Sequence, residues 1–180
     1  DGPDTNFIQN GGPDAAAPLA GWTTGQLTID PGAVIFGSGG LDFLIVNRGS
    51  QLIAEGTPNS PVVFTSRANI EGTATDDSIG QFGGIVILGR APIQQCNQPN
   101  VPGGSINCQS QVEGTTGFYG GATANDNSGR IRYVQVRYPG FEVSTGNELN
   151  GITLAGVGSG TTIDHVLVHN SSEHGIEWFR

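Results

Sequence analysis

The residues best suited to chemistry lie in the second half of the chain, where Arg130, Arg132 and Arg137 stand between Asp126 and Glu142. An arginine base beside carboxylates that bind Ca²⁺ is the chemistry of polysaccharide lyases. Arg130 and Arg132 also flank an apolar residue, so their aliphatic stems are equally suited to covering the wall of a sheet. The three arginines are therefore candidate sugar contacts, with wall covering as the alternative.

Glycoside hydrolysis makes a different demand, because it needs two carboxyl groups about 5–10 Å apart. The carboxylates are scattered along the chain, and the sequence alone brings no pair of them together. The chain also lacks a G-x-S-x-G nucleophile elbow and a phosphate-binding glycine loop. We therefore expect no catalytic residues, and the sequence favours a role without catalysis.

Metal binding has one candidate segment, formed by Asn125, Asp126 and Asn127 in a glycine-rich stretch. Their side-chain oxygens are the hard ligands that Ca²⁺ prefers. The same residue types also make turns, so a structural role is the alternative. No cofactor is required by any motif in the sequence, and calcium is the one candidate.

The chain has two cysteines, Cys96 and Cys108, in a stretch rich in Gln, Asn, Pro and Gly. No C-x-x-C pattern and no nearby histidine supports a redox pair or a metal site. A disulfide that closes a surface loop is favoured, and disulfides persist in oxidising compartments. We therefore expect a secreted protein, placed outside the cell or on a bacterial cell surface.

Charge and composition exclude some classes of binding partner. The 180 residues carry 16 acidic and 7 basic side chains, a net charge of −9, and every basic residue is Arg. Nucleic acids and anionic membrane surfaces are held by clustered basic residues, so neither is an expected partner. No apolar run is long enough to span a membrane. The absence of Met leads us to expect a processed chain, or part of a longer one.

The elements that would position these residues are short strands. Apolar runs of three to five residues recur between Gly, Pro, Asn and Ser at 27–29, 33–36, 43–46, 51–54, 62–65 and 84–88. Segments 131–137 and 163–169 share the pattern I-x-x-V-x-V-x at a separation of 32 residues. A Gly-Ile-x-apolar pattern recurs at 84–87, 151–154 and 175–178. Repeats of this length made of β-type units predict a parallel β-helix, in which Asn47 and Asn170 are candidate corners.

The chain divides into an N-terminal segment and one domain. Residues 1–21 are rich in Gly, Pro, Ala and Asp, which predicts a flexible or irregular segment. Residues 22–180 carry the repeats and form the predicted β-helix domain. An insertion at 91–129 interrupts the repeats and contains both cysteines. Long insertions in compact arrays are often functional, so we expect this one to contribute to any specific contact surface.

A family resemblance accompanies these patterns. Segments 44–49, 52–57, 61–66, 83–93, 125–129 and 149–162 together resemble a group of secreted bacterial proteins of uncharacterised function. Those proteins are expected to be right-handed parallel β-helices, often surface-associated or lipoprotein-like. The resemblance implies an all-β, right-handed parallel β-helix with an inserted disulfide-stapled loop. It implies a fold rather than an activity, because the matching residues are mostly core and turn positions.

The C-terminal end of the repeats suggests a partner. Members of such families usually continue for further coils, whereas this chain ends at Arg180. A bare last coil would expose strand edges together with Ile176, Trp178 and Phe179. We expect this end to meet either the rest of a cleaved precursor or another copy of the chain. The sequence thus favours an extracellular structural or adhesive protein that could serve as a subunit of an end-to-end assembly or filament. A polysaccharide-binding or polysaccharide-degrading module is the alternative.

Overall fold

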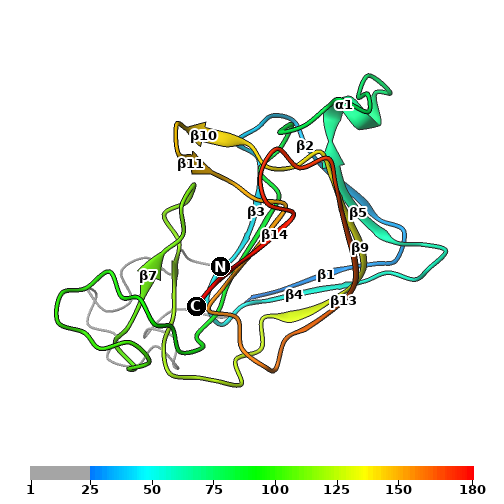
Figure 1. The fold of residues 1–180 in the computed structure, drawn as a ribbon. Helices are drawn as coiled ribbons and strands as arrows, with labels where there is room; N and C mark the ends of the chain where they lie inside the picture. Colours follow the sequence, from blue (N-terminus) through cyan, green and yellow to red (C-terminus); the bar gives the residue numbers. More distant parts are fainter. Residues whose placement is uncertain (1–24) are drawn as a thin grey trace.

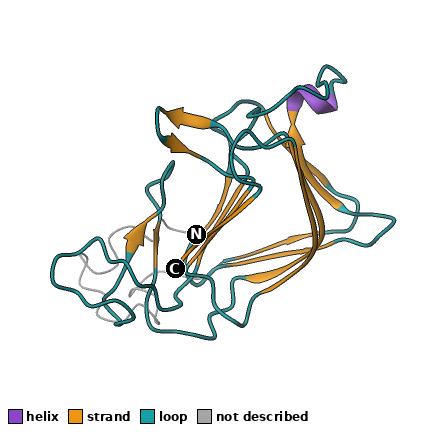
Figure 2. Cartoon of the chain, viewed as in Figure 1, coloured by secondary structure: helices purple, strands orange, loops and turns teal. Residues whose placement is uncertain are grey.

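The computed structural model describes residues 25–180, so the expectation for residues 1–21 lies outside the described part. The chain is built almost entirely of short β-strands joined by turns and loops (Figures 1 and 2). The elements are β1 (Gln26–Ile29), β2 (Val34–Gly37), β3 (Leu44–Val46), β4 (Gln51–Glu55), β5 (Val62–Ser66), α1 (Arg67–Ile70), β6 (Ile85–Leu88), β7 (Ser110–Gln111), β8 (Phe118–Tyr119), β9 (Gly129–Arg137), β10 (Glu142–Ser144), β11 (Asn147–Glu148), β12 (Ile152–Ala155), β13 (Thr162–His169) and β14 (Ile176–Phe179).

The largest sheet has six strands, which pair in parallel although they lie far apart in the sequence. Strand β1 pairs with β4, β4 with the first part of β9, and β9 with β13. Strand β2 pairs with β5, which pairs with the second part of β9. The predicted repeat is confirmed in this sheet, because Ile131 stands opposite Ile163 and Val134 opposite Val166.

A second parallel sheet has the order β14-β12-β6-β3. The Gly-Ile repeat is confirmed here, since Ile85, Ile152 and Ile176 occupy equivalent positions on three neighbouring strands. Successive passes of the chain thus return to the same two sheets in the same order, as Figure 2 shows. Parallel strands need long connections between partners, and each pass through the other sheet supplies one.

The main apolar core lies between the two sheets. Alternate side chains of each strand point into it, including Leu52, Phe64, Ile87 and Leu154. A smaller cluster lies on the outer face of the second sheet, where Val86 and Leu88 meet residues of the insertion. The central strands of the second sheet, β6 and β12, are therefore buried on both faces, and the insertion is held against the rest of the fold by this packing.

Left-handed backbone conformations mark bends of the chain, both within the long strands and after strands. Tyr133 and His165 both have positive φ, at 48° and 52°, and the ladder between β9 and β13 skips them. Their rings stack with centroids 4.4 Å apart. The prediction that Asn170 forms a corner is confirmed by its φ of 53°. The prediction for Asn47 is wrong, because Gly49, two residues later, takes the positive φ of 82° at that corner.

Loops extend from the stacked strands. The four-residue helix α1 begins after Ser66, whose hydroxyl accepts a hydrogen bond from the Asn69 amide. An antiparallel pair, β10 and β11, projects between β9 and β12. The insertion carries a second antiparallel pair, β7 and β8, and lies on the opposite side of the molecule from α1 (Figure 1). Among residues 25–180, no helix is long and apolar enough to cross a membrane.

Candidate functional site

Two buried arginines hold the insertion against the parallel strands: Arg48 binds it directly, and Arg90 supports Arg48. Arg48 follows β3, and its guanidinium donates to the Gly120 carbonyl and to Gln109 Oε1, both at 3.1 Å. Arg90 follows β6 and donates to the Arg48 carbonyl at 3.3 Å. Hydrogen bonds from a buried guanidinium are charge-assisted, and breaking one strongly destabilises the folded state. The insertion is therefore fixed in position relative to β3 and β6.

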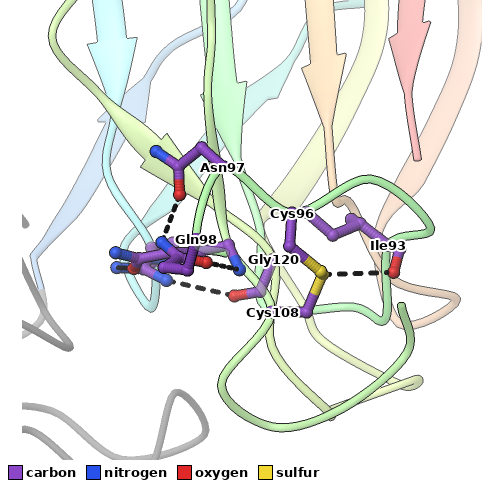
Figure 3. The surroundings of a disulfide bond; sticks show 8 residues. Ile93, Cys96, Asn97, Gln98, Cys108 and Gly120 are labelled. Carbon is purple, nitrogen blue, oxygen red and sulfur yellow. Dashed lines mark hydrogen bonds between the residues drawn. A yellow bond between two sulfur atoms is a disulfide. The ribbon is translucent and has the colours of Figure 1, made fainter. Parts of the chain in front are cut away.

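A disulfide between Cys96 and Cys108 closes the first part of the insertion, as predicted (Figure 3). Cys108 is fully buried and packs in the outer apolar cluster with Ile93 and Val112. The sulfur of Cys108 lies 3.5 Å from the Ile93 carbonyl oxygen. The segment that follows Cys108 therefore leaves from a fixed point, and it leads directly into β7.

A groove of about 620 Å³ opens beside this segment. One wall is the β7–β8 connection, the other comes from the β10–β11 hairpin, and Phe43 joins them from the start of the second sheet. Its lining combines one aromatic ring, two amides, two hydroxyls and one carboxylate: Phe43, Gln111, Val112, Glu113, Gly114, Thr115, Thr116 and Asn147.

Hydrogen bonds set the shape of the β7–β8 connection. The Gly114 amide donates to Asn147 Oδ1 at 2.6 Å, which ties the two walls of the groove together. Gln111 Nε2 donates to the Thr115 carbonyl at 3.0 Å. Gly114 has a φ of 69°, and a Cβ at this position would lie 2.7 Å from the side chain of Leu149. Only glycine suits both the backbone conformation and the close approach.

The electrostatics of the groove are acidic. Partial burial raises the pKa of the Glu113 carboxyl above its usual range, and the nearby carboxylates of Glu177, Glu148 and Glu173 raise it further. His174 acts weakly in the opposite direction. A carboxyl group with a raised pKa accepts hydrogen bonds from hydroxyl groups, and in its protonated form it also donates one.

The three candidate arginines lie on the outer face of the six-stranded sheet, away from this groove. Arg130 pairs with Glu55 at 2.9 Å, and Arg132 pairs with Asp164 at 3.0 Å. The guanidinium of Arg137 lies 5.7 Å from the ring centre of Tyr138. These partners match the wall-covering alternative, and the role of the arginines in sugar contact stays a prediction.

The Asn125–Asn127 segment is divided between surface and interior. Asp126 is 7% exposed, and its carboxylate accepts a hydrogen bond from the Ser128 hydroxyl at 3.1 Å. Burial raises the pKa of the Asp126 carboxyl. Asn127 Oδ1 accepts from the Gly129 amide at 2.9 Å, which is the turn role considered above. In the described part of the chain no group of three or more His, Cys, Asp or Glu side chains is placed to hold a metal ion. Calcium stays a prediction.

The residues predicted for the C-terminal end fall into two groups. Ile176 and Trp178 are 38% and 65% exposed, although their counterparts Ile152 and Leu154 on the neighbouring strand are buried. Phe179 points to the outer cluster instead, where its ring lies 6.1 Å from that of Tyr119. Ile176 and Trp178 thus form an apolar end, and its role in assembly stays a prediction.

Sequence reasoning located the insertion but missed the groove residues. The Gly114-Thr115-Thr116-Gly117 run before Phe118 was a signal for a tight turn between two strands. Nothing in the sequence could place Phe43 and Asn147 beside that turn. They are brought there by the second sheet and the hairpin, which depend on pairing across distant parts of the chain.

The sequence of the chain also matches a known family of proteins. A sequence profile described as a pectate-lyase-like β-helix domain matches residues 17–180. The chain belongs to this family. No curated protein and no solved structure matches it. The parallel sheets and the repeat register agree with membership of a β-helix family. The disulfide lies within the insertion, and the groove lies between the insertion, Phe43 and Asn147.

Proposed function

We propose that this protein is an extracellular adhesive module, a right-handed parallel β-helix whose inserted loop forms a polysaccharide-binding groove. The observation that carries the proposal is the groove itself, lined by Phe43, polar side chains and a single carboxyl group. Membership of a pectate-lyase-like family supports polysaccharide as the class of ligand. The disulfide supports an extracellular location, because such bonds persist in oxidising compartments.

The lining has the chemistry that sugars require. An aromatic face packs against the C–H groups of a sugar ring, while amides and hydroxyls exchange hydrogen bonds with its hydroxyl groups. Asn147 uses its carbonyl oxygen to accept from Gly114, and its NH₂ group remains a donor. The walls are fixed by the disulfide and the buried arginines, so little conformational entropy is lost when a ligand binds.

Binding is a better interpretation than cleavage. A glycoside hydrolase needs two carboxyl groups on either side of the scissile bond. Glu113 is the one carboxyl-bearing residue among the described residues that line the groove. The candidate arginine bases lie on another face, where Arg130 and Arg132 are engaged in ion pairs. The arrangement therefore supports a module that holds a polysaccharide without changing it.

The test is affinity electrophoresis of the purified protein in gels that contain soluble plant and bacterial polysaccharides. We expect at least one polysaccharide to retard the wild-type protein, and Phe43→Leu to reduce the retardation at least about threefold, as loss of a stacking contact of about 1 kcal/mol predicts. Phe36→Leu is the matched control, because Phe36 is exposed and lies outside the groove lining. Equal retardation of both variants, or none for the wild type, would refute the proposal.

A second candidate function, a subunit of an end-to-end assembly, rests on the apolar end of the last strands. Trp178 and Ile176 are exposed where equivalent residues in the preceding strand are buried. Such an end can accept further parallel strands, from a second copy or from the adjoining part of a precursor. Analytical ultracentrifugation of this chain tests self-association. We expect concentration-dependent association that Trp178→Glu abolishes, whereas a monomer up to about 100 μM would exclude a role for copies of the chain.

A further inference from the structure

We infer that the groove selects an uncharged polysaccharide and rejects the polyuronates that are suggested by the description of its family. This inference rests on the proposed function and specifies the substrate class of the same groove. It follows from two properties of the described residues: the groove lining contains no basic side chain, and the one charged group in it is the carboxyl group of Glu113.

The lining excludes the usual means of holding a uronate. A polyuronate carries a carboxylate on every sugar ring, and proteins bind such groups through Arg, Lys or a bound cation. Among the described residues of the lining there is no Arg, Lys or His. The chain has no Lys at all. Arg48 and Arg90 follow the ends of β3 and β6, and both are buried. Arg48 donates a hydrogen bond to Gln109, and Arg90 donates one to the Arg48 carbonyl.

The surrounding charge adds repulsion. Glu148 lies on the β10–β11 hairpin next to Asn147, and Glu177 lies on β14. Both act on Glu113, together with Glu173 in the loop before β14. Glu177 is held in place by a hydrogen bond from Asn150 Nδ2 at 2.6 Å. His174 acts weakly in the opposite direction, so the net influence on Glu113 is that of negative charge. A ligand carboxylate near Glu113 would be repelled, and its affinity would fall further at low salt.

The rest of the lining favours neutral sugars. Phe43 supplies an apolar surface, Gln111 and Asn147 supply amides, and the connection between them supplies two threonine hydroxyls. The carboxyl group of Glu113 adds an acceptor for sugar hydroxyls. None of these contacts needs a charge on the ligand. The groove is thus complete as a site for an uncharged chain without any metal ion or basic partner.

The test is isothermal titration calorimetry in about 0.15 M salt, which screens long-range charge effects beyond about 8 Å. The probes are three hexasaccharides of similar size: a neutral β-glucan fragment, a galacturonate fragment and a glucosamine fragment with free amines. We expect the neutral hexasaccharide to bind at least about tenfold more tightly than the galacturonate one, equivalent to 1.4 kcal/mol. The glucosamine fragment should bind within about fivefold of the neutral one, because solvent and salt weaken the attraction between its amines and the carboxylates near the groove.

Variants separate charge from shape. Glu113→Lys should strengthen galacturonate binding at least about fivefold, and it should weaken neutral binding, because the acceptor that Glu113 offers to sugar hydroxyls is lost. Glu71→Lys makes the same change of charge beside α1, on the opposite side of the molecule (Figure 1), and should change neither. Circular dichroism shows whether Glu113→Lys is folded. If it is not, Glu113→Gln provides the same test, with a smaller expected gain in galacturonate affinity.

Each other result overturns the inference. Tighter binding of galacturonate than of the neutral fragment would refute the selectivity and leave the proposed binding function in place. Glucosamine binding more than about tenfold tighter than neutral binding would make the groove a cation site. If none of the fragments binds, and no polysaccharide retards the protein in gels, both the inference and the proposed function fail.

Discussion

The disulfide offers the sharpest quantitative prediction about the insertion. Cys96 and Cys108 are 12 positions apart, and a cross-link that closes a loop of this length stabilises the folded state by about 3 kcal/mol through the lost entropy of the unfolded chain. The double variant Cys96→Ala with Cys108→Ala should lose about this amount of unfolding free energy. Cys108 is fully buried beside Ile93 and Val112, so the missing sulfur adds to the loss rather than offsetting it.

The measurement is urea unfolding followed by circular dichroism and by tryptophan fluorescence. For a domain of this size, a loss of about 3 kcal/mol corresponds to a fall of about 6–12 °C in the melting temperature. Reduction of the wild type with dithiothreitol is the control, and it should bring wild type and double variant to within about 1 kcal/mol of each other. If the oxidised wild type and the double variant differ by less than about 0.5 kcal/mol, the insertion does not depend on this cross-link and the reasoning is wrong.

Two further predictions concern the core and the buried carboxyl group. Leu154→Ala should reduce the free energy of unfolding by about 2–5 kcal/mol, because Leu154 is 1% exposed between the two sheets; Leu41→Ala, at a residue 62% exposed, should stay within about 0.5 kcal/mol in the same urea titration. Burial raises the pKa of Asp126 above its unfolded value of 3.8, so the folded state keeps this proton where the unfolded chain has lost it. This carboxyl group therefore lowers the stability as pH rises from about 3.8 through its folded pKa, and Asp126→Asn should become more stable relative to wild type across that window. A difference between the two proteins that does not change with pH would contradict this assignment.

The sequence was sufficient to predict the β-class of the fold and part of its register. The I-x-x-V-x-V-x and Gly-Ile patterns repeat because equivalent residues stack in neighbouring parallel strands. Such stacking requires similar residues at regular intervals, so the sequence itself becomes periodic. The prediction of the corner at Asn170 succeeded because Asn tolerates a left-handed backbone. The same reasoning failed at Asn47, because the nearby Gly49 adopts the left-handed backbone conformation with less strain than an asparagine would.

The candidate site could be predicted only as a region. The length of the insertion and its cysteines identified 91–129 as elaborated, and the disulfide followed from composition. The groove depends on contacts between residues that are remote in sequence, such as Gly114 with Asn147. The arginines that the sequence offers as candidate sugar contacts lie elsewhere, because the alternation of side chains along β9 directs them to the outer wall.

The most direct test of the central claim is a nuclear magnetic resonance titration of the labelled protein with the neutral polysaccharide fragment. We expect the amide shifts to cluster in the β7–β8 connection, at Asn147 and around Phe43, where the groove lies. Residues of the outer wall, such as Arg130 and Arg132, should not shift. Shifts that cluster on that wall instead, or an absence of shifts at saturating ligand, would contradict the claim that this groove is the binding site.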